Sequence, residues 1–119
     1  MDKVLNILTQ LRIGVLPDEY ILQNQIASLL QANDILFDKE YKLGRGNRVD
    51  FLTADGIAIE VKKGKPNKAS VLRQLQRYAE YEEIQGIILV VETSLTVPHD
   101  VAGKPCRALG LQKLWGIAL

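Results

Sequence analysis

The sequence predicts an α/β fold in which helices flank a mixed central sheet. Apolar residues recur at helical spacing before residue 33 and again over residues 68–82, whereas short extended runs separated by turn residues occupy 35–63. The unbroken apolar run at residues 87–91 suits a strand that is buried on both faces beside a parallel neighbour. With 119 residues, 47% of them hydrophobic, the chain can form one packed core but not two, so we expect residues 1–119 to be a single domain.

Two helices are expected first. Apolar residues at positions 4, 5, 8, 11 and 15 predict a short helix that stops near Gly14. Pro17 and Asp18 open a second helix, whose apolar stripe at positions 22, 26, 29 and 30 ends at the break at 33–34. Glu19 lies at the inward end of that stripe. It either complements the helix dipole in the first turn or points along the core face towards a site.

Three strands are expected next, at residues 35–43, 47–53 and 57–63, with turns at 44–46 and 54–56. The second turn decides whether Asp50 and Glu60 meet. A two-residue Asp55-Gly56 loop would leave the two acids on opposite faces, because side chains alternate along a strand. A three-residue loop, with Gly56 in the left-handed conformation, pairs Asp50 with Glu60, and we favour this register.

A third helix is predicted over residues 68–82, with Tyr78 on its apolar side and Asn67 or Ser70 as its cap. The buried strand at 86–91 follows. After Thr93 the pattern weakens to a final strand at 104–109 and an apolar tail at 111–119. This tail carries Trp115 and either covers the core or contacts another subunit.

Charge is distributed unevenly along the chain, although the net charge is only +1. Residues 39–77 contain ten basic and four acidic side chains, which gives this stretch +6 and leaves −5 for the remainder. Such runs are usually solvated surface, but here the excess of cations can hold a polyanion.

Several functional classes are poorly supported. Cys106 is the only cysteine, which excludes an intramolecular disulfide and paired-cysteine zinc sites and fits a reducing compartment. His99 is the only histidine, and no Walker-type phosphate loop occurs. No apolar segment is long enough for a membrane span, so we expect a cytoplasmic protein without a membrane partner.

The candidate chemistry lies on the second and third strands. Glu60 and Lys62 are two residues apart and therefore project from one face. With Asp50 opposite Glu60, two carboxylates converge, and such oxygen pairs suit Mg²⁺ or Mn²⁺. An ion there polarises a phosphodiester and lowers the pKa of its bound water, while Lys62 orients the water or stabilises charge on the phosphorus. The same spacing also occurs in exposed hairpins with a cross-strand ion pair. Gln74, one turn before Tyr78, could touch a phosphate or metal-bound water.

The arrangement resembles the PD-(D/E)XK nuclease superfamily over about residues 17–92. The Gln-x3-Tyr motif is similar to that of phage exonucleases and RecB-like nucleases, and the compact size is similar to archaeal Holliday junction resolvases and phage VRR-NUC domains, which tend to be homodimers. The matching residues are Val49-Asp50 for the Pro-Asp step, with valine in place of proline, Glu60-Val61-Lys62 for (D/E)XK, and Gln74 and Tyr78 for Gln-x3-Tyr.

The resemblance implies a restriction-endonuclease-like αβββαβ core and a divalent-metal-dependent nuclease that hydrolyses DNA, including branched or structured DNA, as a homodimer. It implies a metal held by Asp50, Glu60 and the Val61 backbone carbonyl, with Glu19 acting through a second water, Lys62 at the attacking water, and Gln74 nearby. Glu40 competes with Glu19 for its role, and we favour Glu19. Expected nucleic-acid contacts are Arg45, Arg48, Lys63, Lys65, Lys68, Arg73, Arg77 and Tyr78.

Two functions other than DNA hydrolysis are compatible with the sequence. The first is a non-catalytic nucleic-acid-binding module with the nuclease fold. The carboxylate pair argues against it, because two acids beside phosphate would repel it unless a metal were bound. A partner-binding role, in which the Trp115 tail docks on a larger protein, is compatible with either.

Overall fold

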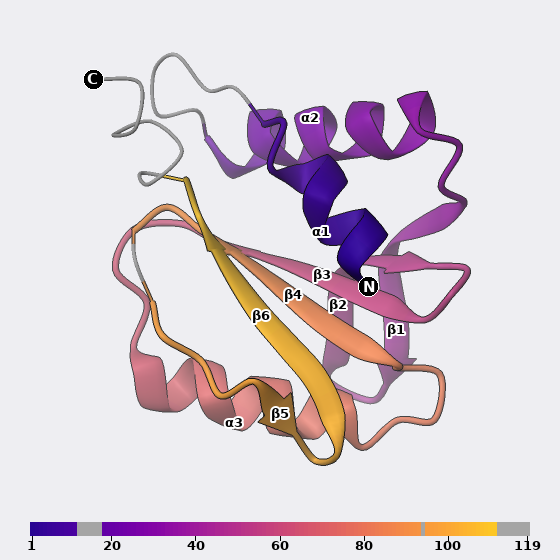
Figure 1. The fold of residues 1–119 in the computed structure, drawn as a ribbon. Coiled ribbons are helices and arrows are strands. Elements are labelled where there is room, and N and C mark those ends of the chain that lie inside the picture. Colours follow the sequence, from indigo (N-terminus) through magenta and orange to yellow (C-terminus); the bar gives the residue numbers. More distant parts are fainter. Residues whose placement is uncertain (12–17, 94, 112–119) are drawn as a thin grey trace.

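The computed structural model describes residues 1–11, 18–93 and 95–111, and the statements below concern these residues. They form a mixed α/β fold with a six-stranded sheet in the order β1-β2-β3-β4-β6-β5 (Figure 1). The helices are α1 (Asp2–Leu8), α2 (Glu19–Ala32) and α3 (Lys68–Ala79). The strands are β1 (Phe37–Gly44), β2 (Asn47–Thr53), β3 (Ile57–Lys62), β4 (Gly86–Val91), β5 (Asp100–Val101) and β6 (Lys104–Gly110).

The sheet combines antiparallel and parallel pairing. β1, β2 and β3 form an antiparallel meander, β4 runs parallel to β3, and β6 runs parallel to β4. The short β5 pairs antiparallel with β6. The predicted order of helix, three strands, helix and buried strand is therefore confirmed over residues 19–91.

Helices cover both faces of the sheet, with α1 and α2 on one side and α3 on the other (Figure 1). Two apolar cores result, because side chains on β3 and β4 point alternately to the two faces. The first core joins Ile59, Val61, Ile88 and Val90 to Leu8, Leu22, Ile26 and Leu30 of α1 and α2. The second joins Ala58, Leu89 and Val91 to Val71, Leu75 and Tyr78 of α3.

Side-chain caps begin the two longer helices. The Asp18 Oδ1 accepts a hydrogen bond from the Ile21 N–H at 2.8 Å, and the Asn67 Oδ1 accepts from the Ser70 N–H at 3.0 Å. Each bond satisfies a donor that the first helical turn leaves unpaired. Of the two caps proposed for α3, Asn67 is the one observed.

Helices α1 and α3 end earlier than predicted. α1 ends at Leu8, where the Thr9 hydroxyl donates to the Asn6 carbonyl at 2.6 Å. The predicted end near Gly14 was wrong, and Gly14 itself lies outside the described residues. α3 ends at Ala79 and not at residue 82, because the backbone tightens into short-range bonds such as Glu80 N–H to the Arg77 carbonyl.

The turn between β2 and β3 has three residues, as predicted. Gly56 adopts a φ of +86°, and its N–H donates to the Thr53 carbonyl at 2.9 Å. The Thr53 hydroxyl in turn accepts from the Ile57 N–H at 3.0 Å. This turn fixes the register in which Phe51 pairs with Ile59.

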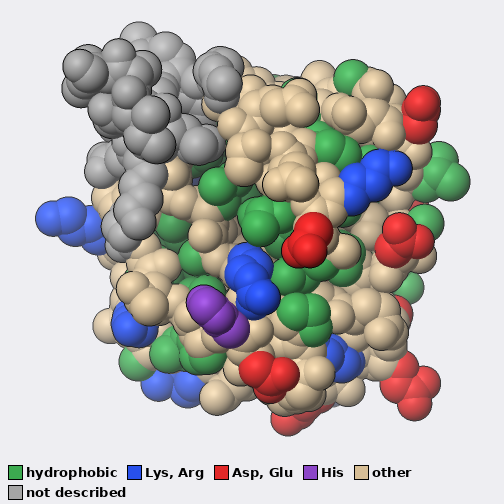
Figure 2. Space-filling model, in the orientation of Figure 1, with side chains coloured by type: hydrophobic (Ala, Val, Ile, Leu, Met, Phe, Trp, Pro, Cys, Tyr) green, Lys and Arg blue, Asp and Glu red, His purple; other side chains and the backbone are tan. Residues whose placement is uncertain are grey.

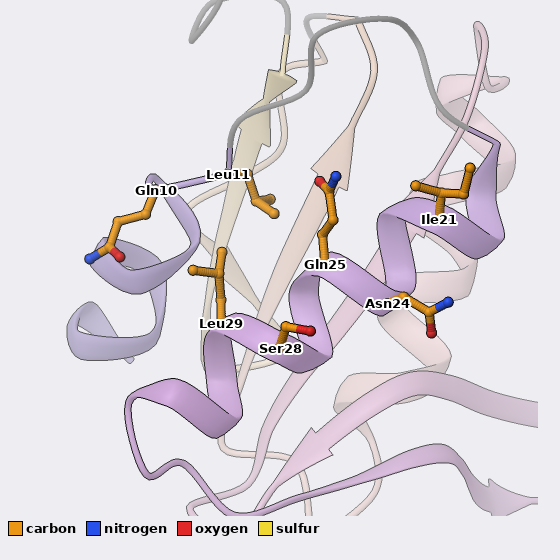
Figure 3. Close-up of a pocket in the computed structure, with 7 residues that line it drawn as sticks. All are labelled: Gln10, Leu11, Ile21, Asn24, Gln25, Ser28 and Leu29. Carbon is orange, nitrogen blue, oxygen red and sulfur yellow. The ribbon is translucent and has the colours of Figure 1, made fainter.

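Two further features lie away from this hairpin. A cavity of about 360 Å³ opens between the end of α1 and α2, with Leu11, Ile21 and Leu29 in its wall (Figure 3).

Cys106 on β6 is fully buried, and burial raises the pKa of its thiol to about 11. None of the helices in the described part of the chain has the length and hydropathy needed to cross a bilayer.

Candidate active site

Backbone pairing between β2 and β3 ends at the Phe51–Ile59 pair. Beyond this pair, the backbone N–H groups of Asp50 and Val61 bond to side-chain carboxylates of the opposite strand. The Asp50 N–H donates to the Glu60 Oε1 at 3.1 Å, and the Val61 N–H donates to the Asp50 Oδ2 at 2.7 Å. Each acid thus accepts a hydrogen bond from the opposite strand. The predicted meeting of Asp50 and Glu60 on one side of the hairpin is confirmed.

The two carboxyl groups share a poorly solvated environment. Glu60 is only 5% exposed. Burial, and then repulsion from Asp50, raises the pKa of Glu60 to about 7. Burial also raises the pKa of Asp50, although the hydrogen bond from Val61 acts against it. A cation between them would favour the charged form of both groups.

Lys62 supplies one positive charge at this place. Its Nζ lies 3.5 Å from the Glu60 Oε2, and its side chain is about one quarter exposed. The ammonium group therefore reaches both the buried carboxylate and the solvent. The predicted proximity of Glu60 and Lys62 is confirmed, whereas the role of Lys62 towards a ligand remains a prediction.

Tyr78 reaches the same carboxylate from α3. Its hydroxyl oxygen lies 2.9 Å from the Arg48 carbonyl and 3.1 Å from the Glu60 Oε2, and the side chain is 2% exposed. Burial and the neighbouring Glu60 raise the pKa of the phenol, so it stays protonated and can donate. Tyr78 was expected to contact nucleic acid. In the structure it is buried and supports Glu60 instead.

Gln74 is half-buried one helical turn before Tyr78, and its side chain has no hydrogen bond to the other described residues. Its spacing places it on the same side of α3. Its expected contact with a phosphate or a bound water remains a prediction.

Glu19 and Glu40 were the two candidates for a third acid. Glu19 is exposed in the first turn of α2, where its Oε1 accepts from the Gln23 Nε2 at 3.5 Å. Glu40 lies opposite Asp50 on β1, between two observed cross-strand pairs, and its charge contributes to the raised pKa of Asp50. The structure thus links Glu40, and not the favoured Glu19, electrostatically to Asp50.

Glu40 has an unusual backbone for the middle of a strand. Its φ is +51°, in the left-handed region that side chains other than glycine rarely adopt. Such strain persists only where the surroundings impose it. Sequence periodicity gave no signal for it.

The donor set can be compared with what a metal requires. Within residues 1–11, 18–93 and 95–111, no three His, Cys, Asp or Glu side chains converge as a metal-binding group. The site offers two carboxylates, to which the Val61 carbonyl can add a third oxygen. Oxygen ligands of this kind fit Mg²⁺ or Mn²⁺, since Mg²⁺ usually keeps several waters and binds few carboxylates. The residues therefore fit such an ion with water completing its shell.

The expected nucleic-acid contacts lie on several elements of the fold. Arg45 and Arg48 are exposed at the β1–β2 turn and the start of β2, whereas Arg73 and Arg77 are exposed on α3. Lys65 and Lys68 are exposed where β3 leads into α3. In Figure 2 basic side chains occur along the left margin beside this connection, while most acidic ones lie on the right half.

Lys63 belongs to a structural contact that sequence reasoning missed. Its Nζ lies 3.5 Å from the Glu92 Oε2, which also accepts from the Gly64 N–H at 2.7 Å. The Glu92 N–H donates to the Lys62 carbonyl at 3.2 Å. The Gly64 bond lowers the pKa of Glu92. Glu92 therefore connects the end of β3, which carries Lys62, to the end of β4. The sequence indicates this contact only by an acidic residue directly after an apolar strand.

Comparison with known proteins gives a family but no activity. No curated protein and no solved structure matches the chain. A match to the family described as "Domain of unknown function (DUF8371)" covers residues 16–94, well over half of the chain, and includes Asp50, Glu60, Lys62 and Tyr78. The chain therefore belongs to the DUF8371 family.

Proposed function

We propose that the protein is a divalent-metal-dependent nuclease that hydrolyses DNA phosphodiester bonds. The observation that carries this proposal is the reciprocal pairing of Asp50 and Glu60 across the end of the β2–β3 hairpin. Two acids with raised pKa values and a lysine beside them are an unfavourable arrangement for stability alone. Perturbed groups of this kind are more frequent at functional sites.

The order of elements supports membership of the PD-(D/E)XK superfamily. A helix, three antiparallel strands, a helix and a strand parallel to the third are present over residues 19–91. This is the order expected for a restriction-endonuclease-like core, and the matching motif residues lie on the expected elements. Fold alone does not define activity, so the proposal depends on the side chains.

Asp50, Glu60 and the Val61 carbonyl are the proposed ligands of Mg²⁺ or Mn²⁺. When bound, such an ion polarises the phosphodiester and promotes ionisation of water. Lys62 would stabilise negative charge that develops on the phosphorus, and its ammonium group beside Glu60, partly open to solvent, supports this role. Tyr78 holds Glu60 in orientation through its hydroxyl.

The exposed cations would hold the DNA backbone: Arg48 lies two residues before Asp50 on β2, Arg77 bonds to Asn47 at the start of β2, and Lys65 and Lys68 follow Lys62 in the chain. Exposed basic groups of this kind supply most of the affinity for a polyanion and make it depend on salt. Branched or structured DNA, a homodimer and a cytoplasmic location remain parts of the same proposal.

Labelled linear, flapped and four-way DNA incubated with the protein tests the proposal, with Mg²⁺ in one arm and EDTA in the other. We expect cleavage only with Mg²⁺. Lys62→Ala should abolish cleavage while DNA binding in EDTA is retained. Lys39→Ala is the matched control, because Lys39 is an exposed lysine that lies opposite Phe51 on β1. DNA binding without cleavage by the wild type under any metal would reject the enzyme and favour the non-catalytic module.

A further inference from the structure

Two like charges face each other across the β1–β2 hairpin. Lys42 pairs directly with Arg48 in the antiparallel register. Both side chains are exposed, and neither has an ion-pair partner in the part of the chain that the structure describes. Like charges at directly opposite positions destabilise a strand pair. The hairpin would be more stable with one of them replaced by a neutral residue.

The same two cations line a shallow cavity of about 350 Å³. Its remaining wall is Gly44, Gly46 and Asn47, which contribute no charge. A concave surface with two cations and no acid is complementary to an anion. The guanidinium group of Arg48 can bind two phosphate oxygens at once, whereas Lys42 provides a compact charge.

The cavity has a fixed position relative to α3. The Asn47 Nδ2 donates to the Tyr81 hydroxyl at 3.0 Å, and the Asn47 Oδ1 accepts from the Arg77 Nε at 3.2 Å. A methyl group at Gly44 would collide with the Tyr81 ring, which shows how closely the turn packs on the segment that follows this helix. The hairpin end is therefore held and not free to move away from the helix.

The cavity is connected to the carboxylate pair along β2, because Arg48 in its wall lies two residues before Asp50 on this strand. The Tyr78 hydroxyl lies within hydrogen-bonding distance of both the Arg48 carbonyl and the Glu60 Oε2. The backbone of Arg48, from which its guanidinium group extends, is therefore connected through one hydroxyl group to the acid that would hold the metal. A polyanion whose phosphate reached Glu60 would have its next phosphates near this hairpin.

We infer that Lys42 and Arg48 form a phosphate subsite that binds the nucleic-acid backbone beside the Asp50–Glu60 pair. The inference rests on the proposed function for the identity of the polyanion. Lys42, which was not among the expected nucleic-acid contacts, thereby becomes a binding residue. The subsite would determine the direction in which the nucleic-acid strand runs away from Asp50 and Glu60. The repulsion between the two cations is relieved when the phosphate binds.

Binding in EDTA tests the subsite independently of cleavage. Affinity for a fluorescent single-stranded oligonucleotide and for a duplex is measured over a salt series for wild type, Lys42→Gln and Lys39→Gln. We expect Lys42→Gln to weaken binding about threefold to tenfold near 0.1 M salt and to reduce the slope of log K against log salt by about one. Lys39→Gln should leave the slope unchanged.

Thermal unfolding separates this role from a structural one. Lys42→Gln should raise the Tm slightly, because one repulsive pair is removed, while DNA binding falls. An unchanged salt slope in Lys42→Gln would overturn the inference. Binding of inorganic phosphate at the cavity, followed by NMR shifts of the Gly44 and Gly46 amides, together with an unchanged DNA slope would also overturn it and assign the cavity to free anions.

Failure of this inference and failure of the proposed nuclease give different results. If the subsite is wrong but the enzyme is right, Mg²⁺-dependent cleavage remains and Lys42→Gln binds DNA like the wild type. If the enzyme is wrong but the subsite is right, no cleavage occurs, yet Lys42→Gln still loses DNA affinity in EDTA.

Discussion

The two ends of the β2–β3 hairpin satisfy their backbone groups in different ways. At the turn, Gly56 and Thr53 close the chain with short-range hydrogen bonds. At the other end the carboxylates of Asp50 and Glu60 take the N–H groups that a regular ladder would give to carbonyls. The hydrogen bonds at the turn stabilise the hairpin. At the far end, burial disfavours the ionised forms of the Asp50 and Glu60 carboxyl groups.

The difference shows how one end depends on the other. A three-residue turn sets the register, and only this register brings the two acids together. A change at the turn should therefore alter folding, whereas a change at the acids should alter chemistry and make folding easier. The experiments below test this division, beginning with the largest expected effect.

Asp50→Asn should lower Mg²⁺-dependent cleavage on the order of 10³-fold, a loss typical of removing one electrostatic group from an active site. The same change should raise the Tm of the metal-free protein, because it removes a charge that burial disfavours. Asp55→Asn, in the exposed turn, is the control and should change neither. Normal cleavage by Asp50→Asn would exclude the carboxylate pair as the metal site.

Gly56→Ala should destabilise the protein by about 3 kcal/mol in urea unfolding. A side chain at φ +86° is strained, and the new methyl group would lie 2.7 Å from the Glu83 carbonyl. Gly46→Ala isolates the backbone strain, because Gly46 has a φ of +77° and open space around it. Equal losses of stability in the two variants would show that the contact with Glu83 has no effect.

Stability of the metal-free protein should fall as pH rises. The folded state raises the pKa of Glu60 from its usual 4.5 to about 7, so folded molecules bind more protons than unfolded ones within this window. The contribution is complete below pH 4.5 and is lost through pH 7, on the order of 2 kcal/mol between pH 5 and 8. Chemical unfolding in EDTA measures it. Glu60→Gln should flatten the profile, and the same slope in that variant would assign the effect to other groups.

Tyr78→Phe should have the smallest effect, about 1 kcal/mol of stability. It leaves the Glu60 Oε2 without its hydroxyl donor, so Mg²⁺ affinity by calorimetry should fall roughly tenfold, as for other residues that orient metal ligands. Tyr81→Phe also loses a hydroxyl, but one bonded to Asn47, and should keep the metal affinity. Equal Mg²⁺ affinities in the two variants would limit Tyr78 to a packing role.

Periodicity and turn chemistry predicted the features that depend on local sequence. Gly56 in a three-residue turn gave the register, and the register gave the meeting of Asp50 and Glu60. The apolar run of β4 predicted a strand buried on both faces beside a parallel neighbour, which the pairing with β3 confirms. These inferences succeed because one residue type or one short pattern decides each of them.

Features that depend on distant segments could not be predicted in this way. The position of Glu40 opposite Asp50, with a left-handed backbone, results from the pairing of β1 and β2. The bonds of Glu92 to the end of β3 join residues 28 apart. Spacing favoured Glu19 over Glu40 because helical periodicity is visible in the sequence, whereas the distance between a helix and a strand is not.

The single thiol of Cys106 makes the native protein its own reporter of opening at β6. A fully buried sulfur with a pKa of about 11 is protonated at neutral pH and shielded from alkylating reagents, so it should react only when β6 separates from the elements packed around it, such as β4 and α3. The rate of labelling by iodoacetamide would then measure how often this edge of the sheet unfolds, without any engineered probe.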